Sequence, residues 1–217
     1  MKENYCHIVG IIDCSGSMVG LENDVIGGFN KFVDDQRKAK GTATMSLIQF
    51  DDGYYSDFEF VNINDVPDLN RDTYIPRGMT ALYDAIGKTI NSTGEVLKNM
   101  NENDRPDRVV VFIQTDGQEN SSLEYNANSI KQMINKQEEM YNWSFVFLGA
   151  NINAKSTANI IGIDKKMSMT FAANSKGTTS AFNSVSENLS AVRCGTKLNM
   201  CYESKDYSAQ ADAGLHI

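Results

Sequence analysis

The sequence is poor in the residues that define several protein classes. Of its 217 residues, 3 are proline, 2 are histidine and 4 are cysteine, and no two cysteines form a C-x-x-C pair. This composition disfavours collagen-like, disulfide-rich and zinc- or copper-dependent proteins. No apolar run approaches the roughly 20 residues that cross a membrane as a helix, so no membrane association is expected.

Basic residues are also scarce. The chain has 28 acidic and 20 basic side chains and a formal charge of -8, so no overall field attracts nucleic acid or anionic lipid. The amino-terminal residues lead into a short apolar run, 7–12, which is too brief for an export signal. We therefore expect a cytoplasmic protein, in which Cys6 and Cys14, in or beside that run, are buried free thiols.

The composition is otherwise that of a globular protein, with 41% hydrophobic residues. Apolar runs of strand length alternate with segments of helical period, which predicts an α/β, Rossmann-like, doubly wound and mainly parallel sheet of about six strands with helices on both faces. The expected strands are 7–12, 43–50, 54–63, 108–113, 143–148 and 167–171. The expected helices are 21–38, 82–100, 130–141, 154–160 and 178–192.

One strand of this sheet has a different pattern. Segment 54–63 follows the turn signal Asp51-Asp52-Gly53 and alternates polar with apolar residues, which predicts an antiparallel, half-exposed strand at the sheet edge. Residues 193–217 have no clear period. The sequence therefore predicts one domain, residues 5–192, and a C-terminal tail, residues 193–217.

Oxygen-bearing side chains lie in three loops of the predicted fold. The first strand runs into Asp13-x-Ser15-x-Ser17, the 108–113 strand is followed by Asp116, and Thr80 precedes a helix. Ligands of doubly wound sheets bind beyond the carboxyl ends of the strands, so these side chains are expected to meet. Hydroxyl and carboxylate oxygens are ligands that Mg²⁺ prefers, and Mn²⁺ or Ca²⁺ are possible substitutes. The sequence predicts a metal site at this edge.

These five residues, in this order and on these elements, resemble the metal-ion-dependent adhesion site of von Willebrand factor type A domains. The resemblance implies that Ser15, Ser17 and Thr80 coordinate the ion directly. It implies that Asp13 and Asp116 hold the ion mainly through waters and hydrogen bonds. The resemblance covers roughly residues 5–192 and offers no counterpart for the tail.

The resemblance also implies a function. A cation with a largely neutral inner shell takes a further ligand, which in the family is typically an Asp or Glu carboxylate of a partner protein. Standalone intracellular members act as adaptors or assembly factors, often beside chaperone-like ATPases, in stress responses such as tellurium resistance or in phages. We therefore expect a non-catalytic, Mg²⁺-dependent protein-binding adaptor of bacterial or phage type.

Two features depart from the family pattern. The chain has Arg77-Gly78-Met79 before Thr80, where the family often has two glycines before the threonine. The acidic residues Asp51, Asp52 and Glu119 are also expected near the rim, where negative charge would favour a cation and discourage an acidic partner.

Two other functions remain open at this point. A metal-dependent hydrolase or phosphotransferase would use Asp13 as its nucleophile, although Ser15 stands where such enzymes commonly have a second acidic residue. A structural subunit with a vestigial metal site would instead bind through the 54–63 edge strand. Neither histidine is in an obvious catalytic loop: His7 is expected in the core and His216 is in the tail.

Overall fold

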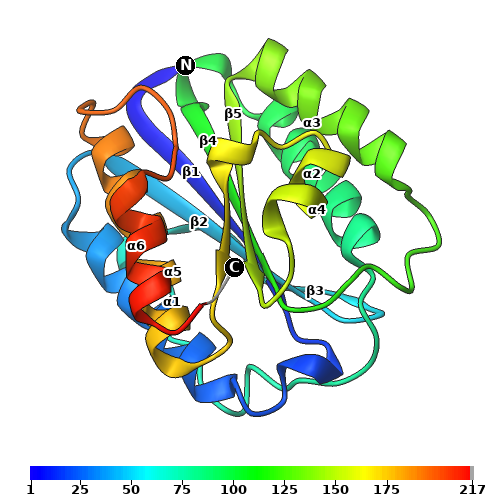
Figure 1. Ribbon diagram of the computed structural model, residues 1–217. Helices are drawn as coiled ribbons and strands as arrows, with labels where there is room; N and C mark the ends of the chain where they lie inside the picture. The colour runs from blue at the N-terminus through cyan, green and yellow to red at the C-terminus, as the bar shows by residue number, and fades with distance from the viewer. Residues whose placement is uncertain (216–217) are drawn as a thin grey trace.

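A six-stranded sheet forms the middle layer of the molecule (Figure 1). The computed structural model describes residues 1–215; His216 and the end of the predicted tail lie outside the described residues. The strands are β1 (Lys2–Asp13), β2 (Thr42–Phe50), β3 (Tyr54–Asn62), β4 (Pro106–Thr115), β5 (Trp143–Ala150) and β6 (Ser168–Phe171). Their order is β3-β2-β1-β4-β5-β6, and every pair is parallel except β2 with β3. The predicted fold class is confirmed.

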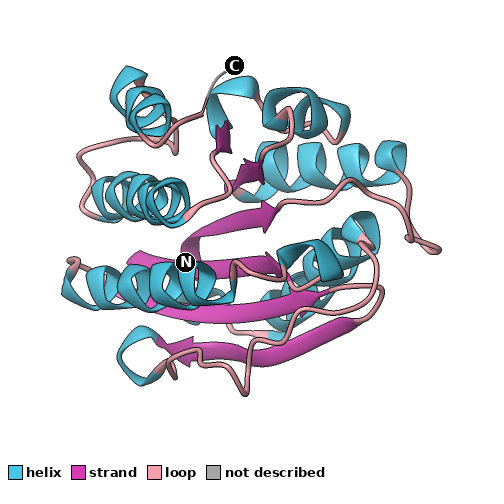
Figure 2. Cartoon of the chain, turned by 60° about the horizontal axis from the view of Figure 1, so that its bottom comes forward, coloured by secondary structure: helices cyan, strands magenta, loops and turns pink. Residues whose placement is uncertain are grey.

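Helices cover both faces of the sheet (Figure 2). They are α1 (Glu22–Lys38), α2 (Leu82–Asn99), α3 (Ala127–Tyr141), α4 (Ala154–Ile160), α5 (Ser175–Arg193) and α6 (Ser204–Asp212). One apolar core lies between the sheet and the pair α1 and α5, and a second lies between the sheet and α2, α3 and α4. None of the helices within residues 1–215 is both long and apolar enough to cross a bilayer.

Strand β1 contributes to both cores, which explains its continuous apolar run. Ile8 and Ile12 face one core, while Val9 and Ile11 face the other, as a strand with alternating side chains between two helix layers requires. Gly10 leaves space for Phe112 of β4, whose ring lies 2.8 Å from the position of an added Cβ. The cysteines predicted to be buried free thiols, 6 and 14, are buried and free.

His7 is a buried histidine of the core, as predicted. Its Nδ1 lies 2.9 Å from Thr44 Oγ1, its Nε2 lies 3.2 Å from Ser46 Oγ, and its ring stacks on Phe60 at 3.7 Å. Burial lowers the pKa of His7 from 6.5 to about 3, although a hydrogen bond with Thr44 opposes the shift. The folded protein therefore holds this imidazole neutral.

Acid is expected to destabilise the fold through His7. Because its pKa is lower in the folded protein than in the unfolded chain, its contribution is complete above pH 6.5 and is lost as the pH falls toward 3. At pH 4.5 the loss is about 2–3 kcal/mol. Urea unfolding of the wild type and of His7→Gln at pH 7 and pH 4.5 measures it. The other titrating groups are common to both proteins, so equal pH dependence in the two would contradict the assignment.

The C-terminal segment contains a helix that the sequence pattern did not predict. Helix α6 lies beside α5 and β6, where Gln210 accepts a hydrogen bond from Ala172 N (3.2 Å) and donates one to Gly177 O (3.1 Å). Tyr207 donates to Ser168 O of β6 (3.3 Å). The helix is only nine residues long and mostly polar, so it has too few apolar positions for a visible period. Its side chains cover one edge of the sheet.

Candidate metal centre

The carboxyl ends of β1 and β4 are adjacent, at the end of the sheet that is lowest in Figure 1. The strands are paired in parallel through Ile12 and Gln114, so the residues that follow them begin at the same level. Asp13 is the last residue of β1, and Asp116 follows β4 directly. This register brings together residues about 100 positions apart in the chain.

A chain of hydrogen bonds joins four of the five predicted metal ligands. Asp13 Oδ1 accepts from Ser15 N at 2.7 Å. Ser15 Oγ lies 3.1 Å from Ser17 Oγ, which donates to Asp116 Oδ1 at 2.6 Å. The tight turn that begins at Ser15 leads into a short 3-10 helix, residues 16–18, and directs both serine hydroxyls to the same side. Two hydroxyls and two carboxylates therefore form one oxygen-rich group.

Thr80 approaches this group from the loop that precedes α2. It is almost fully buried, and its backbone is paired with Asn120: Thr80 N donates to Asn120 Oδ1 (2.9 Å), and Asn120 N donates to Thr80 O (3.0 Å). A Cβ added to Gly117 would lie 2.8 Å from Thr80 Oγ1, so this hydroxyl lies against the residue after Asp116. All five predicted residues are thus at the same edge, although Thr80 has no hydrogen bond to the other four within residues 1–215.

Both carboxylates of the group are in an environment that disfavours their charge. Burial raises the pKa of Asp13 to about 6, although hydrogen bonds from Ser15 and Thr115 oppose the shift. Burial also raises the pKa of Asp116, which is half-buried. A cation would compensate the two negative charges and stabilise both ionised forms.

The oxygen spacing fits a small octahedral cation. Neighbouring oxygens around Mg²⁺, at roughly 2.0–2.1 Å from the ion, are about 3 Å apart, and the two serine hydroxyls are separated by 3.1 Å. Among residues 1–215, no group of three or more His, Cys, Asp or Glu side chains has the arrangement of a metal site. A site with two carboxylates and three hydroxyls therefore suits an ion that keeps some of its waters.

Comparison with known proteins identifies the family. The sequence profile of the von Willebrand factor type A domain matches residues 7–189. The chain belongs to the von Willebrand factor type A (vWA) domain family. No curated protein sequence matches the chain at a significant level.

Solved vWA-like structures are similar in fold. Proximal thread matrix protein 1 from the mussel byssus has a TM-score of 0.60 and 17% identity over 88% of this chain. This chain covers 46% of the mussel protein, less than half of its length. BatB from Bacteroides thetaiotaomicron has a TM-score of 0.54 and 14% identity. The match covers 88% of this chain and 100% of the BatB chain. At these identities the similarity shows the fold alone.

Two of the solved structures contain a divalent metal. A second structure of the mussel protein has zinc in its MIDAS motif, with a TM-score of 0.56 and 15% identity over 88% of this chain and 46% of that chain. The TRAP protein of Plasmodium vivax is manganese-loaded, with a TM-score of 0.53 and 16% identity over 80% of this chain and 71% of that chain. These metals are properties of those proteins.

Three residues that the sequence did not single out support the site of this vWA domain. Thr115 donates a short hydrogen bond to Asp13 Oδ2, and its position directly before Asp116 was the available signal. Tyr74 donates to the backbone carbonyl of Asp13 at 2.6 Å. Asn120 holds Thr80. No local pattern marks Tyr74, because it is 61 residues from Asp13 in the chain.

The loop that departs from the family pattern is bound to the serine loop. Arg77 N donates to Cys14 O at 2.7 Å, and Gly16 N donates to Gly78 O at 3.1 Å. Gly78 has a φ of +69°, and an added Cβ would lie 2.0 Å from Asp52 Oδ1. This position therefore requires glycine, and two backbone hydrogen bonds join the two loops.

The acidic residues near the rim are engaged in local contacts. Asp51 accepts from Gly53 N at 2.6 Å in the β2–β3 turn, where the turn signal predicted it, and it forms an ion pair with Arg77 at 3.2 Å. Glu119 accepts from the backbone N–H groups of Tyr83 and Ser121, both at 3.0 Å. These contacts offset part of the negative potential that the sequence predicts at the rim.

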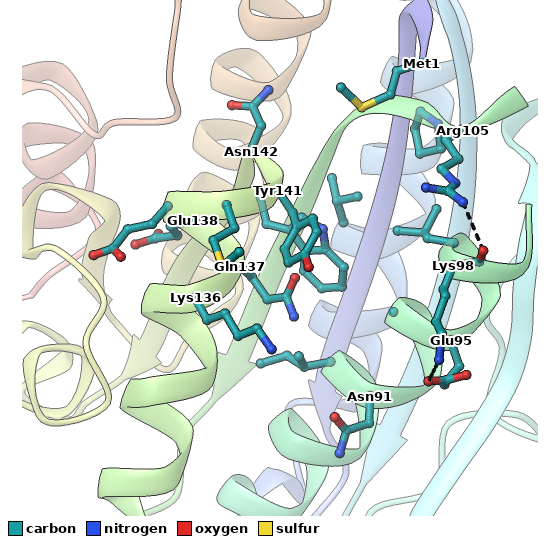
Figure 3. Close-up of a pocket in the computed structure, with 18 residues that line it drawn as sticks. Met1, Asn91, Glu95, Lys98, Arg105, Lys136, Gln137, Glu138, Tyr141 and Asn142 are labelled. Carbon is teal, nitrogen blue, oxygen red and sulfur yellow. Dashed lines mark hydrogen bonds and ion pairs between the residues drawn. The ribbon is translucent and has the colours of Figure 1, made fainter. Parts of the chain in front are cut away.

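A groove lies at the opposite end of the sheet, between α2 and α3 (Figure 3). Its volume is about 690 Å³, and Val109 and Trp143, near the starts of β4 and β5, are among the residues that line it. Glu95 pairs with Lys98 at 3.3 Å along one wall. None of the five candidate metal ligands lines this groove.

Proposed function

We propose that this vWA domain is a non-catalytic, Mg²⁺-dependent protein-binding module. The observation that carries the proposal is the hydrogen-bonded group of oxygens at the carboxyl ends of β1 and β4. Ser15, Ser17 and Thr80 would hold the ion directly, while Asp13 and Asp116 would hold it through waters and balance its charge. When bound, the ion would offer a coordination position to an Asp or Glu carboxylate of a partner protein.

The surroundings of Asp13 favour binding over nucleophilic catalysis. Its side chain is fully buried, its Oδ1 accepts from Ser15 N, and its Oδ2 accepts from Thr115 Oγ1. Both oxygens are therefore directed at the protein and already serve as acceptors. A nucleophilic aspartate needs an oxygen that can reach the substrate, so a hydrolase or phosphotransferase that attacks through Asp13 is the weaker hypothesis.

The proposed partner is a protein with an accessible acidic side chain. Family resemblance alone motivates the narrower expectation that this partner belongs to a chaperone-like ATPase complex and that the chain is a cytoplasmic adaptor in a bacterial or phage stress response. A pull-down with the metal-loaded domain, repeated in EDTA, would identify partners whose capture depends on the ion.

A Mn²⁺ titration followed by electron paramagnetic resonance tests the metal site directly. The wild type is expected to bind one Mn²⁺ saturably and to release it to Mg²⁺. Asp116→Ala is expected to weaken binding by about 10- to 100-fold, because it removes the acceptor that positions Ser17 and one of the site's two negative charges. Asp65→Ala, at an exposed position of the short 3-10 helix Ile63–Asp65, is the control and should bind like the wild type.

Two results would contradict the proposal. Equal Mn²⁺ affinity in the wild type and Asp116→Ala would place the bound ion elsewhere. Mg²⁺-dependent hydrolysis of an aryl phosphate that Asp13→Asn abolishes would instead support the phosphotransferase hypothesis.

A further inference from the structure

Three large apolar side chains are exposed on the loops that form or adjoin the candidate metal site. Val19, Met79 and Leu123 are 65%, 55% and 93% exposed. Val19 is two residues after Ser17, and Met79 immediately precedes Thr80. Burying such side chains is favourable, so their exposure on neighbouring loops of a folded domain indicates a surface that binds another molecule.

Leu123 reaches the same edge through the loop after β4. Ser121, two residues earlier, donates from its backbone N–H to Thr80 O at 3.3 Å. This contact places the loop beside the threonine of the metal site. The three apolar residues therefore come from three loops that the fold brings together, and we call them the apolar collar.

The backbone of each collar residue is fixed. Leu123 N donates to Asp84 Oδ2 at 2.9 Å, and Asp84, which is buried, also accepts from the next two backbone N–H groups. Met79 N donates to Asp52 Oδ1 at 3.3 Å. Val19 N donates to Gly16 O at 3.3 Å. Because these hydrogen bonds already order the backbone, little further conformational entropy of the backbone is lost when a partner binds.

The charges next to the collar indicate what it would accept. The nearby carboxylates of Asp52, Asp84 and Glu119 already accept hydrogen bonds from the backbone of the same loops. The collar itself contributes no charge. With an ion held by the metal site, a partner segment would meet a cation together with the apolar side chains of the neighbouring loops.

We propose that the apolar collar selects partner segments in which the acidic residue is flanked by apolar side chains. This inference rests on the proposed function, because the metal ion must hold the carboxylate. The collar then determines which acidic residues bind: an apolar neighbour is buried against Leu123, Met79 or Val19, whereas a polar neighbour loses its hydration without a hydrogen-bond partner.

Methyl NMR of the Mg²⁺-loaded protein with three capped hexapeptides tests the proposal. The first peptide has glutamate between leucine and phenylalanine, the second has glutamate between serines, and the third repeats the first with glutamine in place of glutamate. With ¹³C-methyl methionine, the first peptide is expected to shift the Met79 signal and to leave Met140, which is 65% exposed on α3, unchanged. Its dissociation constant should be about tenfold lower than that of the second.

Two leucine variants provide the matched comparison. Leu123→Ser should bring the dissociation constants of the first two peptides close together, without changing Mn²⁺ affinity. Leu198→Ser, at a position that is 89% exposed after α5, should keep the tenfold preference.

Each alternative outcome has a distinct meaning. Equal binding of both glutamate peptides in Mg²⁺ would overturn the collar but preserve the proposed function. Equal binding of the glutamine and glutamate peptides would contradict the proposal that the metal ion binds a carboxylate of the partner. It would therefore also contradict the proposal that the collar selects among acidic residues. Binding of none of the peptides by the Mn²⁺-competent protein would overturn both proposals.

Discussion

Replacing Asp13 by asparagine is expected to stabilise the metal-free protein while abolishing its stabilisation by Mg²⁺. Burial raises the pKa of Asp13 from 3.8 to about 6, so the fold favours the protonated carboxyl. The stability that protonation provides is present below pH 3.8 and is lost as the pH rises to about 6. Asparagine cannot ionise, so at pH 7 the variant should regain about 2–3 kcal/mol in EDTA.

The hydrogen bonds around Asp13 can accommodate this change. The asparagine oxygen can accept from Ser15 N, as Asp13 Oδ1 does at 2.7 Å. The asparagine nitrogen can donate to Thr115 Oγ1, whose own proton can turn to Gly117 O, 3.3 Å away. The substitution therefore removes the charge and keeps both hydrogen-bonded partners of the Asp13 side chain, Ser15 N and Thr115 Oγ1.

Mg²⁺ is expected to stabilise only one of the two proteins. It should stabilise the wild type, by about 2.7 kcal/mol when its concentration is 100 times the dissociation constant. Asp13→Asn should show little change. Urea unfolding in EDTA and in MgCl₂ measures both effects, with Asp65→Asn, at an exposed position, as the control. A variant that is less stable than the wild type in EDTA would show that Asp13 stabilises the fold without a metal.

Adjacent glycines of α1 are expected to respond to alanine in opposite directions. A Cβ at Gly28 would lie 2.3 Å from Cδ2 of Phe182, a buried residue of α5. A Cβ at Gly27 would meet nothing within 4 Å. Gly27→Ala should therefore stabilise the protein by about 0.5–1 kcal/mol through helix propensity. Gly28→Ala should destabilise it by about 1–3 kcal/mol, because the ring must shift in a packed core.

Thermal and urea unfolding of the two variants provide the comparison. Both substitutions have the same intrinsic effect on helix propensity, so the difference between them isolates the packing of α1 against α5. Equal stabilisation by both would mean that Phe182 has room to move, and that the α1–α5 interface is looser than the structure indicates.

Much of the fold follows from the sequence because its strongest signals are periodic. Each predicted strand and helix corresponds to an observed element, and α4 has the predicted limits, Ala154–Ile160. The differences lie at the ends: β1 begins at Lys2 instead of residue 7, because its exposed first residues are polar. Helix α6 was not predicted, because its contacts with the rest of the chain are made by individual polar side chains such as Gln210.

The part of the candidate site that lies in short sequence motifs was predictable. Asp13, Ser15 and Ser17 are close in the chain, and the parallel pairing of β1 and β4 places Asp116 beside them. Residues that hold the site through long-range contacts, such as Tyr74, have no local pattern to mark them. The apolar collar could not be predicted either, since exposure is a property of the folded surface.

The two edge strands of the sheet, β3 and β6, differ in what prevents them from pairing with strands of other molecules. Helix α6 lies over β6, while β3 carries the acidic side chains Asp57 and Glu59 and is kinked at Phe60, which has a φ of +50°. Charges and kinks of this kind prevent strands of other molecules from adding to a sheet. Lateral growth of the sheet is thus blocked on one flank by a helix and on the other by repulsion and irregular geometry. The proposed recognition of a partner protein would then use the ends of the strands, where the loops of the metal site lie.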